Sequence, residues 1–243
     1  MSCLLVYLML IGATAAPAPD DGRPAVFRIT PLRPVADLRK EALAAKPPAE
    51  PGPIKPGDLV ELVKLDASIR LDIRYATSDN FLGVPVYEQA RAFLQRPAAE
   101  ALVRAHRALA ADGFGLLIHD GYRPWWVTKV FWEATPASGH AFVADPAQGS
   151  RHNRGCAVDL TLYRLADGKA VEMPSGYDEM SERAAPGYAG GPAEARRLRD
   201  RLRAAMEHEG FKVFETEWWH FDYAGWRDYP ILNVAFDAIG RPN

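Results

Sequence analysis

The sequence predicts an α+β fold, a single domain with a central, mainly antiparallel sheet flanked by helices. Segments with strand-like alternation and segments with helical spacing follow one another without the regular strand–helix–strand order of parallel α/β sheets. The chain has 243 residues, of which 48% are hydrophobic and 25% charged. This composition is typical of a globular protein and excludes wholesale disorder, collagen and a coiled coil.

The first residues have the composition of a secretory signal. Residues 3–13 are nearly all apolar, and Ala13-Thr14-Ala15 follows the A-x-A pattern of a cleavage site. The apolar run is too short to cross a bilayer, which needs about 20 such residues. No Lys or Arg precedes it, which departs from the usual signal. We therefore expect residues 1–15 to be a signal peptide; a mis-assigned start or a buried N-terminal strand are the alternatives.

A proline-rich segment separates this signal from the domain. Of the 20 prolines, ten fall between Pro17 and Pro56. Proline lacks the amide hydrogen and clashes with the preceding turn of a helix. We therefore expect residues 16–57 to form an extended tether, with a short structured piece at residues 26–32, and the domain to occupy residues 58–243.

The elements of the domain follow from its hydrophobic spacing. Alternation or a short apolar run predicts strands at residues 59–65, 69–75, 115–119, 158–163, 211–214 and 218–223. Apolar residues at helical spacing predict helices at residues 97–112, 125–134 and 193–209. Gly113 and Gly210 end the first and third helices, and Pro124 precedes the second.

Charge and cysteine content narrow the functional classes. Lys and Arg total 29 against 31 Asp and Glu, so the chain has a formal net charge of −2. This balance gives no basic face for a nucleic acid. Two cysteines cannot build a disulfide framework. Removal of the signal would take Cys3 and leave Cys156 as a single, unpaired thiol.

Three polar clusters carry residues suited to metal chemistry. His152, Asp159 and His220 offer the three protein ligands that a catalytic zinc commonly takes. Gly155 would let the backbone fold so that His152 and Asp159 converge. Glu217, three residues before His220, could take a proton from a metal-bound water. Spacing alone leaves the metal site open, because a lone histidine in an apolar stretch is more often a packed core residue. The clusters are GSRHNRGCAVD at 149–159, ETEWWH at 215–220 and DGYRP at 120–124.

Two of these clusters resemble a known family. SRHNRGCAVDLTLY at residues 150–163, followed by EWWHF at 217–221, resembles the D-alanyl-D-alanine dipeptidases, the VanX-like zinc metallopeptidases. The resemblance spans residues 59–228 and leaves the tether unmatched. The shorter pattern SxHxxGxAxD alone indicates only the wider group of zinc D,D-peptidases, which shares its fold with the zinc domain of hedgehog proteins. The other segments in family order are YATSDNFLGVPVY, DGYRP, VEMPSGYDEMSERA and RRLRDRLRAAMEHEGF.

The resemblance implies a catalytic centre with one Zn²⁺ per chain. It makes His152, Asp159 and His220 the zinc ligands and Glu217 the catalytic base. Arg123 matches the arginine that polarises the scissile carbonyl and stabilises the oxyanion. A guanidinium stays charged at any working pH and offers a planar set of donors, so Lys would be a poor substitute there.

The resemblance also implies a substrate pocket that reads both ends of a dipeptide. Asp178 matches the carboxylate that pairs with the free ammonium of the substrate. Ser150 and Tyr75 match positions associated with its C-terminal end. The chain is short between Pro136 and His152, where some family members carry a longer loop, and this places strict selectivity for dipeptides in question.

The expected function is zinc-dependent hydrolysis of the D-alanyl-D-alanine dipeptide to two D-alanines, linked to turnover or recycling of cell-wall dipeptide. Two other interpretations stay open: a zinc D,D-carboxypeptidase or endopeptidase acting on peptidoglycan stem peptides, and a non-catalytic wall-binding module. The expected partner is a small zwitterionic dipeptide, with no nucleic acid and no membrane span. The signal implies a secreted or periplasmic location, and a mis-assigned start would imply a cytoplasmic one.

Overall fold

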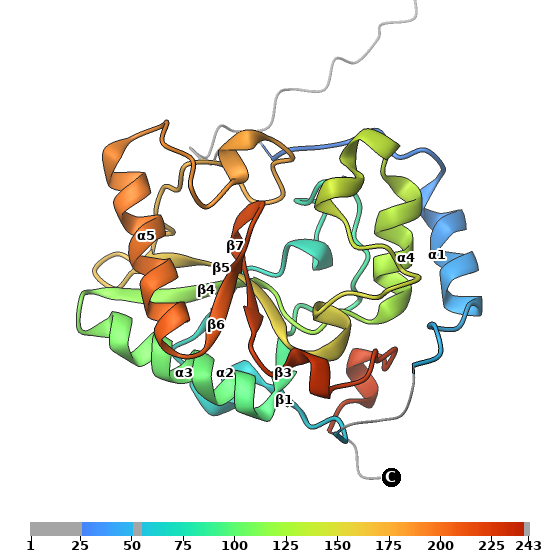
Figure 1. The fold of residues 1–243 in the computed structure, drawn as a ribbon, viewed down its shortest axis with the longest axis horizontal. Coiled ribbons are helices and arrows are strands. Elements are labelled where there is room, and N and C mark those ends of the chain that lie inside the picture. Colours follow the sequence, from blue (N-terminus) through green and yellow to red (C-terminus); the bar gives the residue numbers. More distant parts are fainter. Residues whose placement is uncertain (1–25, 51–54, 241–243) are drawn as a thin grey trace, which may run out of the picture.

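A five-stranded sheet forms the centre of the molecule in the computed structural model, which describes residues 26–50 and 55–240 (Figure 1). The strand order is β2-β4-β5-β7-β6, with β2 parallel to β4 and the other neighbours antiparallel. A separate antiparallel pair joins β1 to β3. The predicted α+β class with a mainly antiparallel sheet is therefore confirmed. The strands are β1 (Leu59–Glu61), β2 (Arg70–Leu71), β3 (Phe93–Gln95), β4 (Phe114–Asp120), β5 (Ala157–Arg164), β6 (Phe211–Phe214) and β7 (Glu217–Tyr223).

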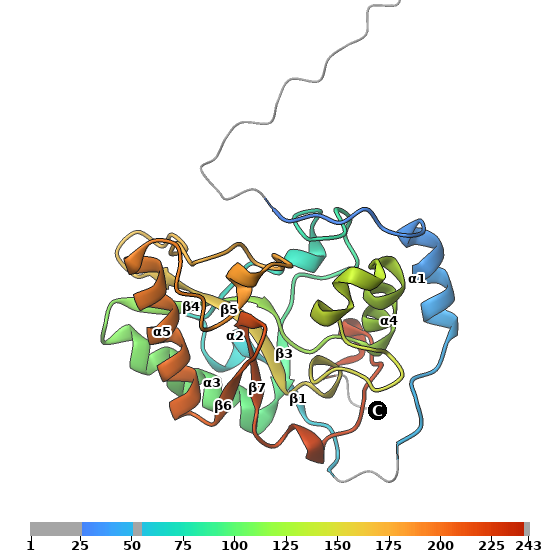
Figure 2. The same ribbon diagram turned by 45° about the horizontal axis from the view of Figure 1, so that its top comes forward.

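The helices form two groups at opposite ends of the molecule. α3 and α5 pack on the sheet and on each other, whereas α1 packs on α4 at the other end in both views (Figures 1 and 2). The α-helices are α1 (Val35–Ala44), α2 (Leu62–Leu65), α3 (Arg96–Ala110), α4 (Trp125–Ala134) and α5 (Ala193–His208). Short 3-10 turns lie at Arg74–Ala76, Ala137–Phe142, His152–Arg154, Glu182–Ala184, Trp226–Asp228 and Phe236–Ala238.

The long helices have the predicted amphipathic spacing. In α5 the residues Leu198, Leu202 and Met206 recur every four positions and are all buried. α3 carries Pro97 in its first turn, where the missing amide hydrogen costs nothing. α4 begins directly after Pro124 and has the predicted bounds. These helices and the strands from β4 onward confirm the sequence-based predictions to within a few residues.

The beginning of the domain differs from the prediction. Residues 59–65 and 69–75 were expected to be strands, but only β1 and β2 are extended there, and each is followed by a helical turn. Leu59, Leu62 and Leu65 lie three residues apart, so the same apolar pattern also suits a helical turn, and Leu62 is fully buried in it. Tyr75 lies in the second turn, where its carbonyl oxygen accepts hydrogen bonds from the amides of Val86 and Tyr87.

The expectation of an extended tether is wrong for residues 35–44, which form α1. No proline occurs between Pro34 and Pro47, so the density of prolines on either side concealed a stretch that can be helical. Leu38 and Ala42 are 0% exposed where α1 meets α4. We call residues 26–50 the N-terminal strap.

The strap is hydrogen-bonded to the rest of the domain. The amide of Ile29 donates to the carbonyl oxygen of Phe81, and the amide of Leu32 donates to that of Ala134, each at 2.9 Å. The proposed signal at residues 1–15 lies outside the described residues. Among the residues that are described, no helix has both the length and the apolar character needed to cross a bilayer.

Candidate active site

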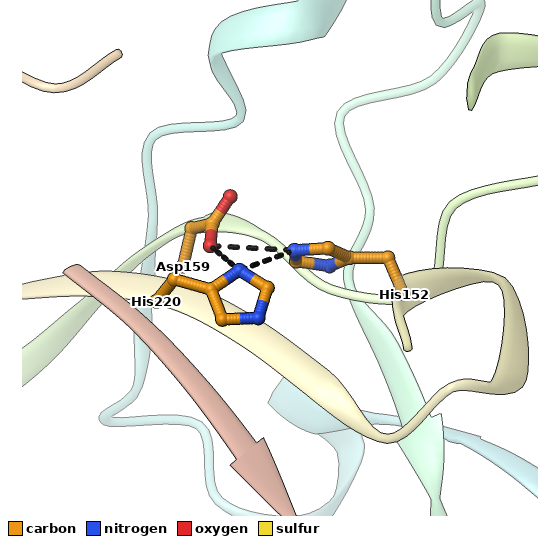
Figure 3. Close-up of side chains that lie close together, drawn as sticks. All are labelled: His152, Asp159 and His220. Atoms are coloured by element: carbon orange, nitrogen blue, oxygen red, sulfur yellow. Dashed lines mark hydrogen bonds and ion pairs between the residues drawn. The ribbon is translucent and has the colours of Figure 1, made fainter. Parts of the chain in front are cut away.

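Three side chains from β5, β7 and the turn before β5 converge at one point (Figure 3). Asp159 on β5 and His220 on β7 are register partners, so they share one face of the sheet. Nε2 of His152 lies 3.3 Å from Oδ1 of Asp159 and 3.1 Å from Nδ1 of His220. Nδ1 of His220 lies 3.1 Å from the same Asp159 oxygen. The structure thus brings together the three metal ligands predicted from the sequence.

Gly155 makes the reversal that joins the turn of His152 to β5. Its φ is +67°, a left-handed conformation that side chains rarely adopt. A Cβ at this position would lie 2.5 Å from Cδ2 of Leu59. The close approach and the backbone angle both require glycine, as the sequence analysis expected for the convergence of His152 and Asp159.

Hydrogen bonds aim the unprotonated nitrogens of both histidines at the same point. Nδ1 of His152 lies 2.8 Å from the carbonyl oxygen of Gly121, which can only accept, so this nitrogen carries the proton. Nε2 of His220 lies 2.9 Å from Oδ1 of Asp222 and donates to it. When both rings are neutral, the remaining nitrogens therefore present lone pairs to each other and to Asp159.

The point where these lone pairs meet attracts a cation. Oδ1 of Asp159 is buried and accepts no hydrogen bond from any described residue. Burial opposes its charge, but His152 and His220 hold the pKa of Asp159 well below its usual value. Burial likewise opposes the cationic form of His220, yet the carboxylates of Asp159 and Asp222 raise its pKa to about 10, so a metal ion bound here would take the place of a second ring proton. Two imidazole nitrogens and one carboxylate oxygen therefore fit a divalent metal ion.

Glu217 lies beside these ligands at the start of β7. A register shift between Val213 and Phe214 places it opposite Phe214. Its Oε2 is 3.7 Å from Nδ1 of His220, and the residue is 9% exposed. Burial raises the pKa of Glu217 to about 7, although the charge of His220 acts in the opposite direction. A carboxyl group that titrates near neutral pH can both take up and release a proton.

Arg123 lies two residues before the start of α4 and is buried against two aromatic rings. Its Nε donates to Oδ2 of Asp120 at 2.9 Å, and its Nη2 lies 3.8 Å from Oδ2 of Asp159. The guanidinium carbon is 4.8 Å from the ring centre of Phe131 and 5.4 Å from that of Tyr75. Burial disfavours the cation, but Asp120 keeps the pKa of Arg123 well above its ordinary value. The group is therefore charged and fixed in direction.

Hydrogen bonds through Tyr75 and Tyr177 connect Asp178 to Asp159. The hydroxyl of Tyr75 donates to Asp178, 2.9 Å from one carboxylate oxygen and 3.1 Å from the other. The hydroxyl of Tyr177 donates to Oδ2 of Asp159 at 2.9 Å and lies 3.2 Å from that of Tyr75. Burial and the charge of Asp159 raise the pKa of Asp178 well above its usual value. A cation bound next to Asp178 would favour its charged form.

One pocket collects all eight residues that the sequence analysis assigned to the site. The empty space in this pocket is about 770 Å³, including the open space at its mouth. Ser150 lies in its wall, where its hydroxyl accepts a hydrogen bond from the amide of His152. The eight residues are Tyr75, Arg123, Ser150, His152, Asp159, Asp178, Glu217 and His220. Apolar side chains complete the wall: Phe81, Phe131, Phe142, Met180, Phe214 and Trp219.

The family model for D-Ala-D-Ala dipeptidases matches residues 55–236, which include this whole pocket. The chain belongs to this family. It is 36% identical over 185 residues to the D-alanyl-D-alanine dipeptidase of Escherichia coli (strain K12), covering 76% of this chain and 94% of the relative. It is 40% identical over 193 residues to that of Enterococcus faecium, covering 70% and 91%. A relative of the same name in Streptomyces coelicolor is 36% identical over 199 residues, covering 74% and 97%.

The match to the D-Ala-D-Ala dipeptidase family does not include the N-terminal strap. It begins at residue 55, whereas the strap occupies residues 26–50 and reaches the pocket wall through Phe81. In this member of the family, residues outside the matched region are therefore part of the packed domain.

Sequence reasoning missed three residues that support the site. Asp222, which orients His220, lies two positions further along the same strand and so faces the same side. Asp120, which holds Arg123, stands in the DGYRP cluster that was considered for its arginine alone. Tyr177 directly precedes Asp178. The spacing of Asp222 from His220 was a usable signal, because a ligand histidine usually gives its second nitrogen to a carboxylate or carbonyl oxygen.

Proposed function

We propose that this protein is a zinc-dependent dipeptidase that hydrolyses D-Ala-D-Ala to two D-alanines. The observation that carries the proposal is the convergence of His152, Asp159 and His220 in one pocket with Glu217 and Arg123. The relatives named as D-alanyl-D-alanine dipeptidases support the choice of substrate.

Zinc is the metal that best suits these donors. Imidazole nitrogens with a carboxylate oxygen are typical of catalytic zinc sites, which keep a further position open. When bound, zinc supplies Lewis acidity and makes water a stronger acid. His152 and His220 each donate their second N–H to an oxygen, of Gly121 and of Asp222, and this fixes the ring nitrogen that would face the metal.

Glu217 and Arg123 would carry out the proton transfer and stabilise the developing charge. The Glu217 carboxylate accepts a proton from the attacking water and delivers it to the amine that departs, a role suited to its pKa of about 7. Arg123 donates hydrogen bonds to the oxygen of the scissile carbonyl as negative charge develops there. Because Asp120 holds the guanidinium in place, little reorganisation is needed at that step.

Asp178 would restrict the enzyme to substrates with a free N-terminus. Its carboxylate is close to Asp159 through the hydrogen-bonded tyrosines, so a bound ammonium ion would lie one residue from the cleaved bond. Ser150, whose hydroxyl accepts a hydrogen bond from the amide of His152, would contact the C-terminal residue of the substrate.

The direct test is hydrolysis of D-Ala-D-Ala and L-Ala-L-Ala, each with and without a zinc chelator. We expect turnover of the D,D-dipeptide alone, lost with chelator and restored by zinc. A stem pentapeptide ending in D-Ala-D-Ala separates the related activity: faster release of D-alanine from it than from the dipeptide would identify a carboxypeptidase. No hydrolysis of any of these peptides by the zinc-loaded protein would refute the enzymatic proposal.

Glu217→Gln tests the assigned base. The variant should retain zinc, measured by metal analysis, and lose nearly all turnover. Glu215→Gln is the matched control, because Glu215 is exposed, lies two residues away and does not line the pocket. Near wild-type activity in Glu217→Gln, or a comparable loss in Glu215→Gln, would show that the base is another group.

We further propose that the protein is exported and acts on dipeptide released from the cell wall. The support is the apolar run at residues 3–13 with its A-x-A site. The N-terminal sequence of protein recovered from its own host tests this proposal. A mature chain beginning near residue 16 is expected, and an intact N-terminus in the cytoplasmic fraction would contradict export.

A further inference from the structure

We propose that Arg151 binds the carboxylate at the C-terminal end of the substrate and so determines the preference for a free acid at that end. The inference rests on the proposed dipeptidase function. It concerns a residue of the SRHNRG motif to which neither the resemblance nor the metal site gives a role.

Arg151 lies at the edge of the pocket between Ser150 and the ligand His152. It lines the pocket, and 38% of its side chain is exposed. Its guanidinium carbon lies 5.5 Å from the ring centre of Phe214, another lining residue. That ring centre is 5.2 Å from the ring centre of His220. The cationic group is therefore separated from the metal ligands by one aromatic ring.

Arg151 has hydrogen-bonding capacity that the protein does not use. The other arginine in the pocket, Arg123, already donates to Asp120. No side-chain hydrogen bond from Arg151 to any described residue is present, and its Nε is buried without an acceptor. Its ion pair is with Oδ2 of Asp222, 3.5 Å from Nε. A guanidinium has five donors in a planar fork that matches a carboxylate.

Asp178 and Arg151 are connected to different metal ligands. Asp178 connects through Tyr75 and Tyr177 to Asp159. Arg151 pairs with Asp222, which accepts a hydrogen bond from His220. A dipeptide with its scissile carbonyl at the metal has its ammonium and carboxylate groups at opposite ends. An anion connected to one ligand and a cation connected to another therefore suit the two ends of a dipeptide.

The stacking on Trp226 holds the guanidinium at this position. The guanidinium carbon of Arg151 is 5.0 Å from the ring centre of Trp226. Arg227 stacks on the same ring at 4.2 Å but does not line the pocket and is exposed. The chain therefore contains a matched control: two arginines contact one tryptophan ring, and only Arg151 of the two lines the pocket.

The test compares D-Ala-D-Ala with its C-terminal amide. Wild type should prefer the acid, and Arg151→Gln should lower this preference, measured as the ratio of kcat/KM values, by about 10- to 100-fold, the usual effect of losing a charge-assisted hydrogen bond. The loss should come mainly from KM for the acid, with the amide little changed. Arg151→Lys should retain part of the preference, and Arg227→Gln all of it.

Three results would overturn the inference. One is an unchanged ratio in Arg151→Gln, and another is an equal loss for acid and amide, which would assign Arg151 a structural role through Asp222. The third is a wild type with no preference for the acid. If Arg151→Gln fails to fold, Arg151→Lys decides by the same ratio. Absence of all hydrolysis by wild type would refute the proposed function as well, whereas an active enzyme with an unchanged ratio would refute only this inference.

Discussion

Removal of the Asp222 carboxylate should weaken metal binding, although Asp222 is not itself a metal ligand. Oδ1 of Asp222 accepts a hydrogen bond from Nε2 of His220 at 2.9 Å, and the Asp222 side chain is only 14% exposed. This hydrogen bond holds the ring and keeps the proton off Nδ1, the atom that faces Asp159 and His152. In Asp222→Ala the imidazole can rotate or move its proton to Nδ1, and either change removes a ligand.

The expected magnitude follows from the kind of interaction that is lost. Removing such a partner of a ligand histidine typically lowers metal affinity 10- to 100-fold, which corresponds to about 1.4–2.7 kcal/mol. Asp222→Asn should lose less than Asp222→Ala, because its amide oxygen can still accept the hydrogen bond. Zinc affinity is measured by competition with a chromophoric chelator, and turnover of D-Ala-D-Ala is then measured at saturating zinc.

Asp167→Ala is the control. The substitution removes the same charge, but Asp167 pairs with Arg164 in an exposed turn. It should bind zinc as wild type does. If Asp222→Ala also bound zinc with wild-type affinity, the role of His220 as a ligand held through its second nitrogen would be refuted.

Three further predictions concern stability and reactivity. Leu38→Ala should lower the free energy of unfolding, measured in urea, by about 2–5 kcal/mol. Leu43 lies on the same helix but is 53% exposed, so Leu43→Ala should change this free energy by less than about 0.5 kcal/mol. Equal effects would show that α1 is not packed against the domain. Burial raises the pKa of the Cys156 thiol to about 12, so iodoacetamide at about pH 8 should label this thiol only after unfolding. Mass spectrometry measures the labelling, and rapid labelling of the native protein would contradict the burial of Cys156. Burial lowers the pKa of His106 below 6.5, and its Nδ1 accepts a hydrogen bond from the amide of Leu116. The unfolded state therefore binds this proton more readily, and the contribution of His106 to stability is complete above about pH 6.5 and is lost as the pH falls below it. His106→Gln should show a shallower loss of unfolding free energy on acidification, and an unchanged slope would refute this assignment.

Helices with strong end signals were predictable from the sequence. α4 begins after Pro124, and its bounds agree with the prediction because proline fixes the first turn. α5 repeats its buried residues at helical spacing over its whole length. In both, local sequence and packing favour the same structure, so the neighbouring elements were not needed to recognise them.

The parts that were mispredicted depend on distant contacts. α1 has few local signals, and its Leu38 becomes a core residue only because α4 lies against it. The segment at Leu62 suits a strand or a helical turn by its spacing, and its amide bonds to the carbonyl oxygen of Ala92, thirty positions away. Whether these segments are helical or extended depends on tertiary contacts, which a single sequence does not reveal.

The candidate site shows the same division. His152 and Asp159 were recognisable because the segment SRHNRGCAVD around them resembles a family motif, whereas their spacing alone left the metal site open. The residues that support them come from elsewhere in the chain: Gly121 gives its carbonyl oxygen to His152, and Tyr177 gives its hydroxyl to Asp159. Their roles follow from which strand and which turn lie alongside β5, and no spacing in the sequence encodes that.

The backbone at Asp178 limits how this pocket can evolve. Its φ of +57° is left-handed, a conformation that costs most side chains about 1–2 kcal/mol but that Asn, Asp and Gly adopt readily. Asn and Gly are each one nucleotide change from Asp, whereas Glu would keep the charge but strain the chain. The nearest mutational steps therefore remove the anion and leave the fold intact. We therefore expect a change of substrate, in evolution or in a laboratory selection, to begin with Asn or Gly at position 178. The new substrates would be peptides whose N-terminus carries no charge.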